Sequence, residues 1–212
     1  MNFEWFLPQG KEFVIDVFNQ YISNFKSEAE FYQLLIVFSV FLFFVFYQTN
    51  EKWRIDKSKK KLIELNKLSI SNSDEAKLLF NKLRRLDPFL FEELILTAID
   101  RFNPNVKIIR NKRYTGDGGV DGLIVINNVK IAIQAKRYRN FINTSDVSKL
   151  EEKLSSVGAS YGLFVHTGKT RPATWQRNEG SNVIIVSGAR MLALVVKGKL
   201  PIELLNLCAS NN

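Results

Sequence analysis

The chain has 212 residues, a formal net charge of +9 and a pI near 9.6. This length allows one domain of ordinary size with attachments, and the basic balance favours anionic partners such as nucleic acid or a phospholipid surface. A lone cysteine, Cys208, excludes an intramolecular disulfide, and a lone histidine, His166, excludes a multi-histidine metal site.

The first 48 residues contain two different apolar patterns, an amphipathic stripe and then an uncharged run. Residues 1–30 contain an apolar stripe at helical spacing, which predicts an extracytoplasmic amphipathic segment on the outer leaflet or against a partner. Packing of this segment on its own chain is equally compatible with the stripe. Residues 31–48 carry no charge and predict a single transmembrane helix, with a buried core helix as the alternative.

A basic linker over residues 49–73 follows the apolar run. Positive charge stays on the cytoplasmic side, so we expect an inner-membrane protein with its N-terminus outside and its C-terminal domain in the cytoplasm. The linker also makes membrane lipids an expected partner. Its basic residues are Lys52, Arg54, Lys57, Lys59, Lys60 and Lys61.

Residues 74–212 alternate between helical and strand patterns. Ser73 and Asp74 suit the start of a helix, although Ala76 does not complete a capping box with Ser73. Three strands in a meander, a crossover helix and two further strands predict an α/β sandwich with a mixed central sheet. The expected helices cover residues 74–85, 88–102, 145–157, 171–178 and 189–197. The expected strands cover residues 105–110, 120–127, 129–138, 161–167 and 182–188.

Polar residues occur unexpectedly inside the predicted hairpin "YTGDGGVDGLIVINNVKIAIQAKRY". Asn127 and Asn128 suit a two-residue turn, because asparagine tolerates positive φ. Counting outward from this turn places Asp121 opposite Gln134. Alternation then puts both residues, together with Lys136, on the face opposite the apolar one.

The helix before the hairpin offers a second acid. Glu92 lies at the edge of that helix's apolar stripe, where it can reach the sheet, whereas Glu93 is expected to point away. Mg²⁺ takes oxygen ligands, which Asp121, Glu92, the Gln134 amide and the Ala135 carbonyl could supply.

Lys136 would lie close to such an ion. There it could orient an attacking water or stabilise charge on a phosphate, which predicts metal-assisted phosphodiester hydrolysis. The alternative is structural: Asp121 caps a turn and Lys136 lies along a solvent-exposed sheet face.

Three motifs in this order resemble a known family. "FEEL" (91–94), "GDGGVDG" (116–122) and "QAKRY" (134–138) are similar to the Mrr-type restriction endonuclease domain of the PD-(D/E)xK nuclease superfamily. The resemblance covers about residues 87–197. It implies a restriction-endonuclease-like fold and metal-dependent DNA cleavage.

The resemblance carries over Asp121, Gln134 and Lys136 as the catalytic core, with Glu92 as a supporting acid. Glutamine stands where the superfamily usually has an acid two residues before the lysine, which predicts modest metal affinity. His166 stands where relatives more often carry a small hydroxyl residue. A strand-end residue near the substrate groove is favoured for it over a catalytic histidine.

Basic residues flank these motifs and could neutralise DNA phosphates with little sequence readout. Taken singly, each could equally be an ordinary solvated charge. They are Arg110, Lys112, Arg113, Arg137, Arg139, Lys149, Lys169 and Arg171.

The sequence therefore predicts a membrane-anchored endonuclease that cuts DNA with Mg²⁺, or with Mn²⁺ as the alternative ion. Restriction or defence against foreign DNA is the expected role. The expected assembly is a homo-oligomer or a complex with partner subunits of a defence system. The competing hypothesis is a catalytically silent nuclease fold that tethers DNA or a partner protein to the membrane.

Overall fold

The structure, a computed structural model, describes residues 20, 28–67, 72–111 and 119–210. It divides into two compact units, Met1–Asn50 and Glu51–Asn212. The first described helix, α2, covers Glu28–Asn66 and therefore contributes to both units.

The N-terminal unit bears on the membrane prediction. Of the predicted amphipathic segment, residues 1–19 and 21–27 lie outside the described residues. Within the described part of the chain, no helix combines the length and hydropathy that crossing a bilayer requires. The predicted transmembrane helix over residues 31–48 is thus not supported, and the location at the inner membrane stays a prediction.

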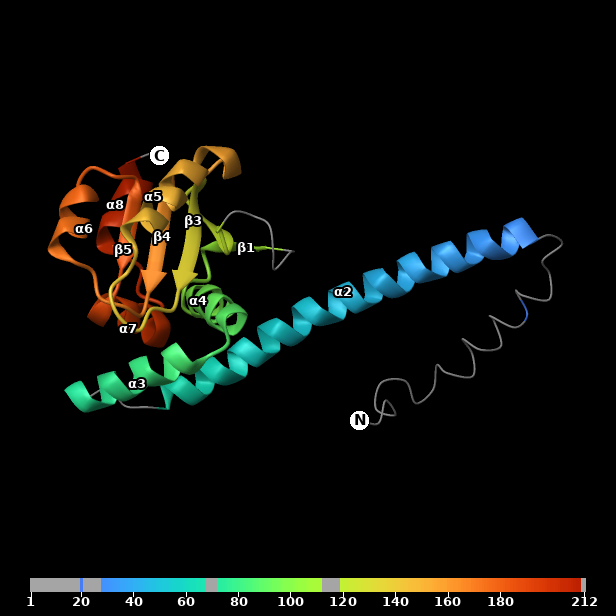
Figure 1. The fold of residues 1–212 in the computed structure, drawn as a ribbon, viewed down its shortest axis with the longest axis horizontal. Coiled ribbons are helices and arrows are strands. Elements are labelled where there is room, and N and C mark those ends of the chain that lie inside the picture. Colours follow the sequence, from blue (N-terminus) through green and yellow to red (C-terminus); the bar gives the residue numbers. More distant parts are fainter. Residues whose placement is uncertain (1–19, 21–27, 68–71, 112–118, 211–212) are drawn as a thin grey trace. The chain divides into compact units, whose positions relative to one another are not determined.

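The second unit is built on a five-stranded sheet with the order β1-β2-β3-β4-β5 (Figure 1). β1 pairs with β2 and β2 with β3 antiparallel, whereas β3 with β4 and β4 with β5 are parallel. This mixed sheet confirms the predicted α/β fold. The strands are β1 (Lys107–Arg110), β2 (Gly122–Ile126), β3 (Val129–Lys136), β4 (Tyr161–His166) and β5 (Val183–Val186).

The β2–β3 hairpin has the predicted register. Asn127 and Asn128 both have positive φ, at 48° and 63°, as a two-residue hairpin turn requires. Ile126 pairs with Val129, and Gly122 pairs with Ile133. The turn therefore fixes which side chains of β3 share a face with those of β2.

Helices α3 and α4 begin at identifiable caps. Asn72, rather than Ser73, caps α3, and its side chain forms a complete capping box with Glu75. Asp87 caps α4 ahead of Pro88, which suits the first helical position. The helices of this part are α3 (Ser73–Arg85), α4 (Pro88–Phe102), α5 (Thr144–Lys153), the short 3₁₀ helix η1 (Ser155–Val157), α6 (Pro172–Arg177), α7 (Gly188–Lys197) and α8 (Ile202–Ser210).

The sequence analysis did not anticipate α8. It buries Leu204 and Cys208 in the main core, and burial raises the pKa of the Cys208 thiol. Cys208 is therefore a core residue.

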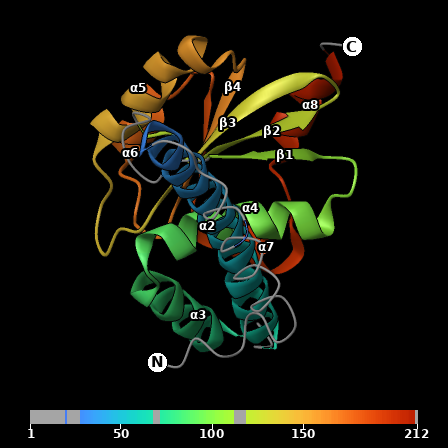
Figure 2. The same cartoon turned by 90° about the vertical axis from the view of Figure 1, so that its right-hand side faces the viewer.

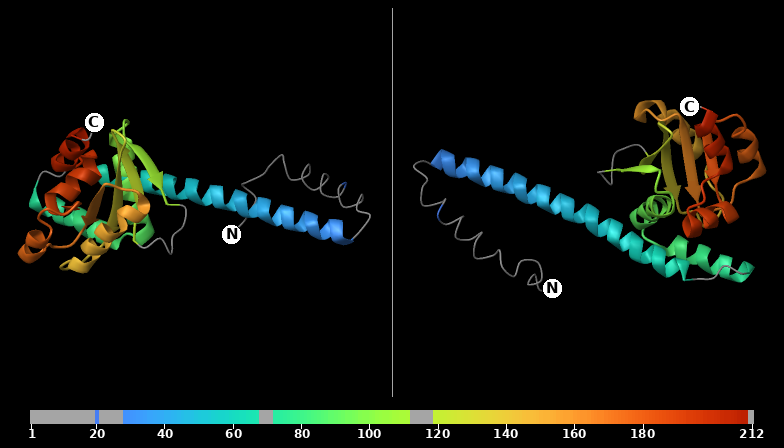
Figure 3. Two further views of the ribbon diagram at one scale, coloured as in Figure 1. Left: turned by 90° about the horizontal axis from the view of Figure 1, so that it is seen from above. Right: turned by 180° about the vertical axis from the view of Figure 1, so that it is seen from behind.

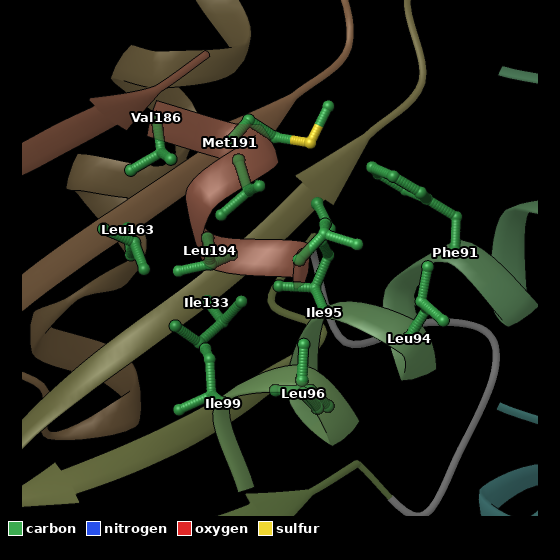
Figure 4. Close-up of a cluster of buried hydrophobic side chains, with 14 of the residues drawn as sticks. Phe91, Leu94, Ile95, Leu96, Ile99, Ile133, Leu163, Val186, Met191 and Leu194 are labelled. Carbon is green, nitrogen blue, oxygen red and sulfur yellow. The ribbon is translucent and has the colours of Figure 1, made fainter. Parts of the chain in front are cut away.

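The two faces of the sheet are covered by different helices (Figures 2 and 3). On one face α4 and α7 enclose the larger core, in which Phe91, Ile95 and Leu194 pack towards Ile133 and Leu163 (Figure 4). On the other face α5 encloses a smaller core around Ala132 and Phe164. Alternation along β3 therefore sends neighbouring residues into different cores.

The end of α2 belongs to this second unit. Leu62 and Leu65 are fully buried in the same core as Leu79 of α3. The Ser58 and Thr97 hydroxyls, 2.7 Å apart, connect α2 to α4. Much of the predicted basic linker is therefore a packed helix rather than a simple connection between domains.

Candidate active site

The polar end of the hairpin lies on the α5 face of the sheet. Ile131, Ile133 and Ala135 belong to the larger core, so the alternating positions Gln134 and Lys136 face α5. Ala132, on this second face, belongs to the smaller core. The structure thus confirms the predicted placement of Gln134 and Lys136 on one face.

Asp121 lies immediately before β2 and continues its pairing with β3. Its N–H donates to the carbonyl of Ile133 at 2.7 Å, and its Oδ2 accepts the N–H of Ala135 at 2.6 Å. The carboxylate therefore reaches β3 between Gln134 and Lys136. The strand pairing ends at Gly122 and Ile133, so the predicted direct opposition of Asp121 and Gln134 stays a prediction.

Gln134 has an unusual polar environment. The residue is 5% exposed, and its Oε1 has no hydrogen-bond partner within the described ranges. Gly119 adopts φ +97° beside it, and a Cβ at that position would lie 2.5 Å from Gln134 Nε2. A glycine is needed here for the backbone conformation and for the close approach to the amide.

Lys136 contacts an acid that the sequence analysis did not single out. Its Nζ lies 3.1 Å from Oδ1 of Asp146 on α5. The other carboxylate oxygen, Oδ2, accepts a hydrogen bond from the Tyr138 hydroxyl. Asp146 thus binds both Lys136, the last residue of β3, and Tyr138, two positions further along the chain.

The start of α5 explains the position of Asp146. The Asn143 side chain accepts the N–H of Ser145 at 3.1 Å and caps the helix, which places Asp146 in the first turn. Next to it, Val147 packs into the smaller core. An acid in the first turn of the predicted crossover helix was visible in the sequence, but its partners depend on the fold.

Burial and hydrogen bonding both act on the ionisation of Asp146 and Tyr138. Burial favours a neutral Asp146, but hydrogen bonds from Tyr138 and Lys136 and the charges of Lys136 and Lys149 outweigh it and lower its pKa. Burial, followed by the hydrogen bond to Asp146, raises the pKa of Tyr138. At neutral pH the site therefore holds a carboxylate facing an un-ionised phenol.

His166 lies beside Lys136 in the parallel β3–β4 pairing. Its side chain is fully buried, and this burial lowers its pKa to about 4. Nδ1 accepts the N–H of Gly168 at 3.1 Å, so in the neutral ring Nε2 carries the proton towards Thr170 Oγ1, 3.0 Å away. These contacts make His166 a structural anchor of the loop after β4.

Glu93 of α4 differs from the prediction. Glu93, expected to point away, is 6% exposed and pairs with Arg110 at 2.6 Å. Thr97, which contacts Ser58 of α2, also donates to Glu93, so this acid is enclosed between α2 and Arg110 of β1. Glu92 is partly buried, and its place in a metal site stays a prediction.

Two predicted DNA contacts, Arg110 and Arg137, have partners within the chain, and their contact with DNA stays a prediction. Arg110 is 12% exposed and binds Glu93 and Asp100. Burial alone would lower the pKa of Arg110, but its bonds to these two acids raise it. Arg137 donates to the carbonyls of Arg84 and Leu86, and so supports the end of α3.

Other predicted contacts remain accessible in the loops after β3 and β4. Arg139, Lys169 and Arg171 are exposed. The two loops are joined, since Ile142 N–H donates to the Lys169 carbonyl at 3.0 Å. Lys149 is exposed on α5, whereas Lys112 and Arg113 lie outside the described residues.

Comparison with known families accounts for this arrangement. The restriction endonuclease family Mrr_cat matches residues 83–195, which is more than half of the 212-residue chain. The chain belongs to this restriction endonuclease family. The predicted Mrr-type resemblance is therefore confirmed.

Individual relatives share only part of their length with this restriction endonuclease domain. The type IV methyl-directed restriction enzyme EcoKMrr of Escherichia coli (strain K12) is 25% identical over 145 residues, covering 66% of this chain and 47% of that protein. The chain therefore spans about half the length of this relative.

Two solved structures also show partial similarity. The DNA modification-dependent restriction endonuclease AspBHI has a TM-score of 0.46 at 22% identity, covering 66% of this chain and 40% of that one. The MspJI restriction endonuclease in complex with a 27-mer oligonucleotide has a TM-score of 0.44 at 22% identity, covering 64% of this chain and 34% of that one.

The donor set at the site fits a hard divalent cation. The buried amide oxygen of Gln134 has no partner in the described part, and the Asp121 carboxylate accepts the N–H of the neighbouring Ala135. Mg²⁺ prefers such oxygen ligands. In the ranges that are described, no three His, Cys, Asp or Glu side chains form a metal cluster. The predicted ligand set contains only two carboxylates, Asp121 and Glu92. The absence of a three-residue cluster in the described ranges therefore does not test this set.

Proposed function

We propose that this chain is a divalent-metal-dependent endonuclease that hydrolyses DNA phosphodiester bonds. One observation carries the proposal: in a restriction endonuclease domain, the buried Gln134 Oε1 has no partner among described residues, and the Asp121 carboxylate binds the N–H of the next residue, Ala135. A buried acceptor without a partner destabilises a fold by about 1–3 kcal/mol, so a ligand explains its position. Asp121, Gln134, the Ala135 carbonyl and Glu92 are the proposed ligands for Mg²⁺ or Mn²⁺.

The reaction needs a nucleophile, a stabilised phosphate and a protonated leaving group. A water oxygen bonds to phosphorus, the bond from phosphorus to the leaving sugar oxygen breaks, and that oxygen gains a proton while the water loses one. When bound, the metal supplies Lewis-acid activation of the phosphate and of the water. Lys136 orients the water and offsets negative charge on the phosphate.

The substrate would be held by the loops that follow β3 and β4. Arg139, Lys169 and Arg171 are exposed there, and each can neutralise a phosphate without reading a base. Their loops are joined by the bridge between Phe141 and Lys169, which keeps these cations at a fixed spacing. We therefore propose binding that depends strongly on salt and weakly on sequence.

Restriction of foreign DNA is the biological role we propose. The relative from Escherichia coli is named as a methyl-directed restriction enzyme, and this chain matches 47% of it. We assign the matched part to cleavage.

The proposal is tested with the full chain and plasmid DNA in Mg²⁺, in Mn²⁺ and in EDTA. We expect cleavage with either metal and none in EDTA. Asp121→Asn and Lys136→Met should each lower the rate by about 10²–10⁴-fold, as expected for groups acting on the transition state. Lys130→Met removes an exposed lysine from the same strand and should leave the rate unchanged.

Two outcomes would contradict the proposal. Metal-independent cleavage, or full cleavage by Asp121→Asn and Lys136→Met, would remove the site from the reaction. DNA binding without cleavage under any metal would instead favour the silent tethering module.

A further inference from the structure

We propose that Asp146 is a positioning residue that holds the Lys136 ammonium group at the site where the phosphate reacts. This inference rests on the proposed nuclease function and extends it to a residue outside the family motifs. Asp146 acts through Lys136 and is not itself assigned a contact with substrate.

The contacts of Asp146 divide between its two carboxylate oxygens. Oδ1 lies 3.1 Å from Lys136 Nζ, and Oδ2 accepts the hydroxyl of Tyr138. The Tyr138 hydroxyl therefore fixes the orientation of the carboxylate. As a result, Oδ1 stays directed at Lys136. Charge-assisted hydrogen bonds of this kind are the stronger ones in proteins.

Lys136 needs such a partner because of its own chemistry. A lysine is a point charge on a flexible four-carbon chain, and holding it in one place costs rotamer entropy. Its side chain is 37% exposed, whereas the Asp146 side chain is 15% exposed. The less exposed acid thus provides the fixed end of the pair.

The elements that carry the pair are held by packing and hydrogen bonds. Asp146 lies in the capped first turn of α5, and Val147 and Leu150 anchor that helix in the smaller core. Tyr138 is fixed on its backbone, because its N–H donates to Thr167 Oγ1 at 3.0 Å and its carbonyl accepts from the same hydroxyl at 2.9 Å. A site supported in this way keeps its geometry when substrate binds.

Charge supports the same role. The charged and titratable groups acting on Asp146 are Lys136 and Tyr138 at the end of β3 and Lys149 on α5, and together they lower the pKa of Asp146. Asp146 is therefore a carboxylate at neutral pH, and it lies at the positive end of the α5 dipole. The lysine then faces a permanent negative charge.

The kinetic test compares Asp146→Asn with a matched variant of the same helix. Asp146→Asn should lower kcat by about 10–100-fold, the usual effect of losing a partner that orients a functional group, and should leave KM for DNA nearly unchanged. Tyr138→Phe should cause a smaller loss, about fivefold, since one hydrogen bond is removed.

Glu151→Gln is the matched control. This acid lies on α5 but binds Ser181 and the N–H of Asn182, so its loss should not change kcat. In a Lys136→Met background, Asp146→Asn should add no further loss, because residues that act as one unit are not additive. An independent effect of Asp146→Asn in that background would overturn the assignment.

A second measurement follows the lysine without catalysis. Acylation of Lys136 by an amine-reactive reagent, followed by mass spectrometry, should be about two- to fivefold faster in Asp146→Asn than in wild type, because the ion pair protects the amine. Labelling of Lys130, which is exposed and is not among the charges acting on Asp146, gives the internal reference, and Glu151→Gln should match wild type.

The outcomes separate the two proposals. An active wild type with an unchanged or higher kcat in Asp146→Asn, or with unchanged Lys136 labelling, overturns the role of Asp146 alone. A wild type that cuts no DNA with any metal overturns the proposed nuclease function, and the catalytic role of Asp146 fails with it.

Discussion

The two faces of β3 follow different physical rules although they alternate along one strand. Towards α4 and α7, Ile131, Ile133 and Ala135 pack in a dry core. Towards α5, Gln134 and Lys136 present an amide and an ammonium group. A period of two residues thus lets one strand build the core and the site together.

The difference shows where stability and function separate. The apolar face contributes burial, which favours folding. The other face keeps a buried amide oxygen that has no partner in the described part of the chain, and this opposes folding. Residues on the polar face should therefore be replaceable without loss of stability but not without loss of activity.

The largest effect is expected at Gln134. Gln134→Met removes the oxygen without leaving a cavity, so we expect cleavage to fall by on the order of 10³-fold while the free energy of unfolding stays equal or rises. Parallel rate and urea-unfolding measurements check both. Gln134→Glu keeps an oxygen and adds charge, so it should retain cleavage and bind metal more tightly. Lower stability in Gln134→Met would contradict the contrast between the faces.

On the apolar face, Ile133→Ala should lower stability, whereas Gln134→Met should not. It removes a fully buried side chain and should lower the free energy of unfolding by about 2–5 kcal/mol. Ile109→Ala, at a position that is 38% exposed on β1, is the control and should cost about 1 kcal/mol or less. Equal losses at the two positions, measured by urea unfolding, would show that this face does not carry the core.

His166 predicts a pH dependence of stability. Burial lowers its pKa to about 4 in the folded protein, below the model-peptide value of 6.5, so the unfolded chain binds the proton first as the pH falls. Stability is then full above pH 6.5 and should fall by on the order of 3 kcal/mol as the pH drops to about 4.

His166→Asn provides the comparison, because it cannot titrate in this range. Urea unfolding of both proteins between pH 7 and pH 4 should show a steeper loss for wild type. Identical slopes would mean that the histidine is not buried in its neutral form.

The smallest effects are expected in the loops after β3 and β4. Replacing Arg139, Lys169 or Arg171 by glutamine should each reduce the slope of log K for DNA against log salt by about 0.9, with little change in kcat. Fluorescence anisotropy in EDTA at several salt concentrations measures this slope. Lys130→Gln, at the other end of β3, is the control. An equal change in its salt slope would show that DNA does not bind preferentially at the loops after β3 and β4.

The sequence predicted the parts of this molecule that depend on local rules. The Asn127-Asn128 turn fixed the hairpin register, and alternation from it placed Gln134 and Lys136 correctly. The order of strands and the mixed sheet followed from the spacing of apolar segments. Local chemistry was sufficient for these features because turn type and strand period constrain each other.

Contacts between distant elements could not be predicted in the same way. Asp146 reaches Lys136 only because the crossover helix returns over the end of β3. Glu93 of α4 binds Arg110 of β1, a partner that was not predicted for either residue. Both partners are set by tertiary packing, which the spacing of residues along the chain does not encode.

The central claim is that the polar face of the hairpin holds a metal ion. A titration with Mn²⁺, in which electron paramagnetic resonance detects the free ion, tests it without requiring catalysis. Wild type should bind Mn²⁺ at a site that Asp121→Asn and Gln134→Met both lose and that Lys130→Met retains. Equal Mn²⁺ binding by all four proteins would contradict the account.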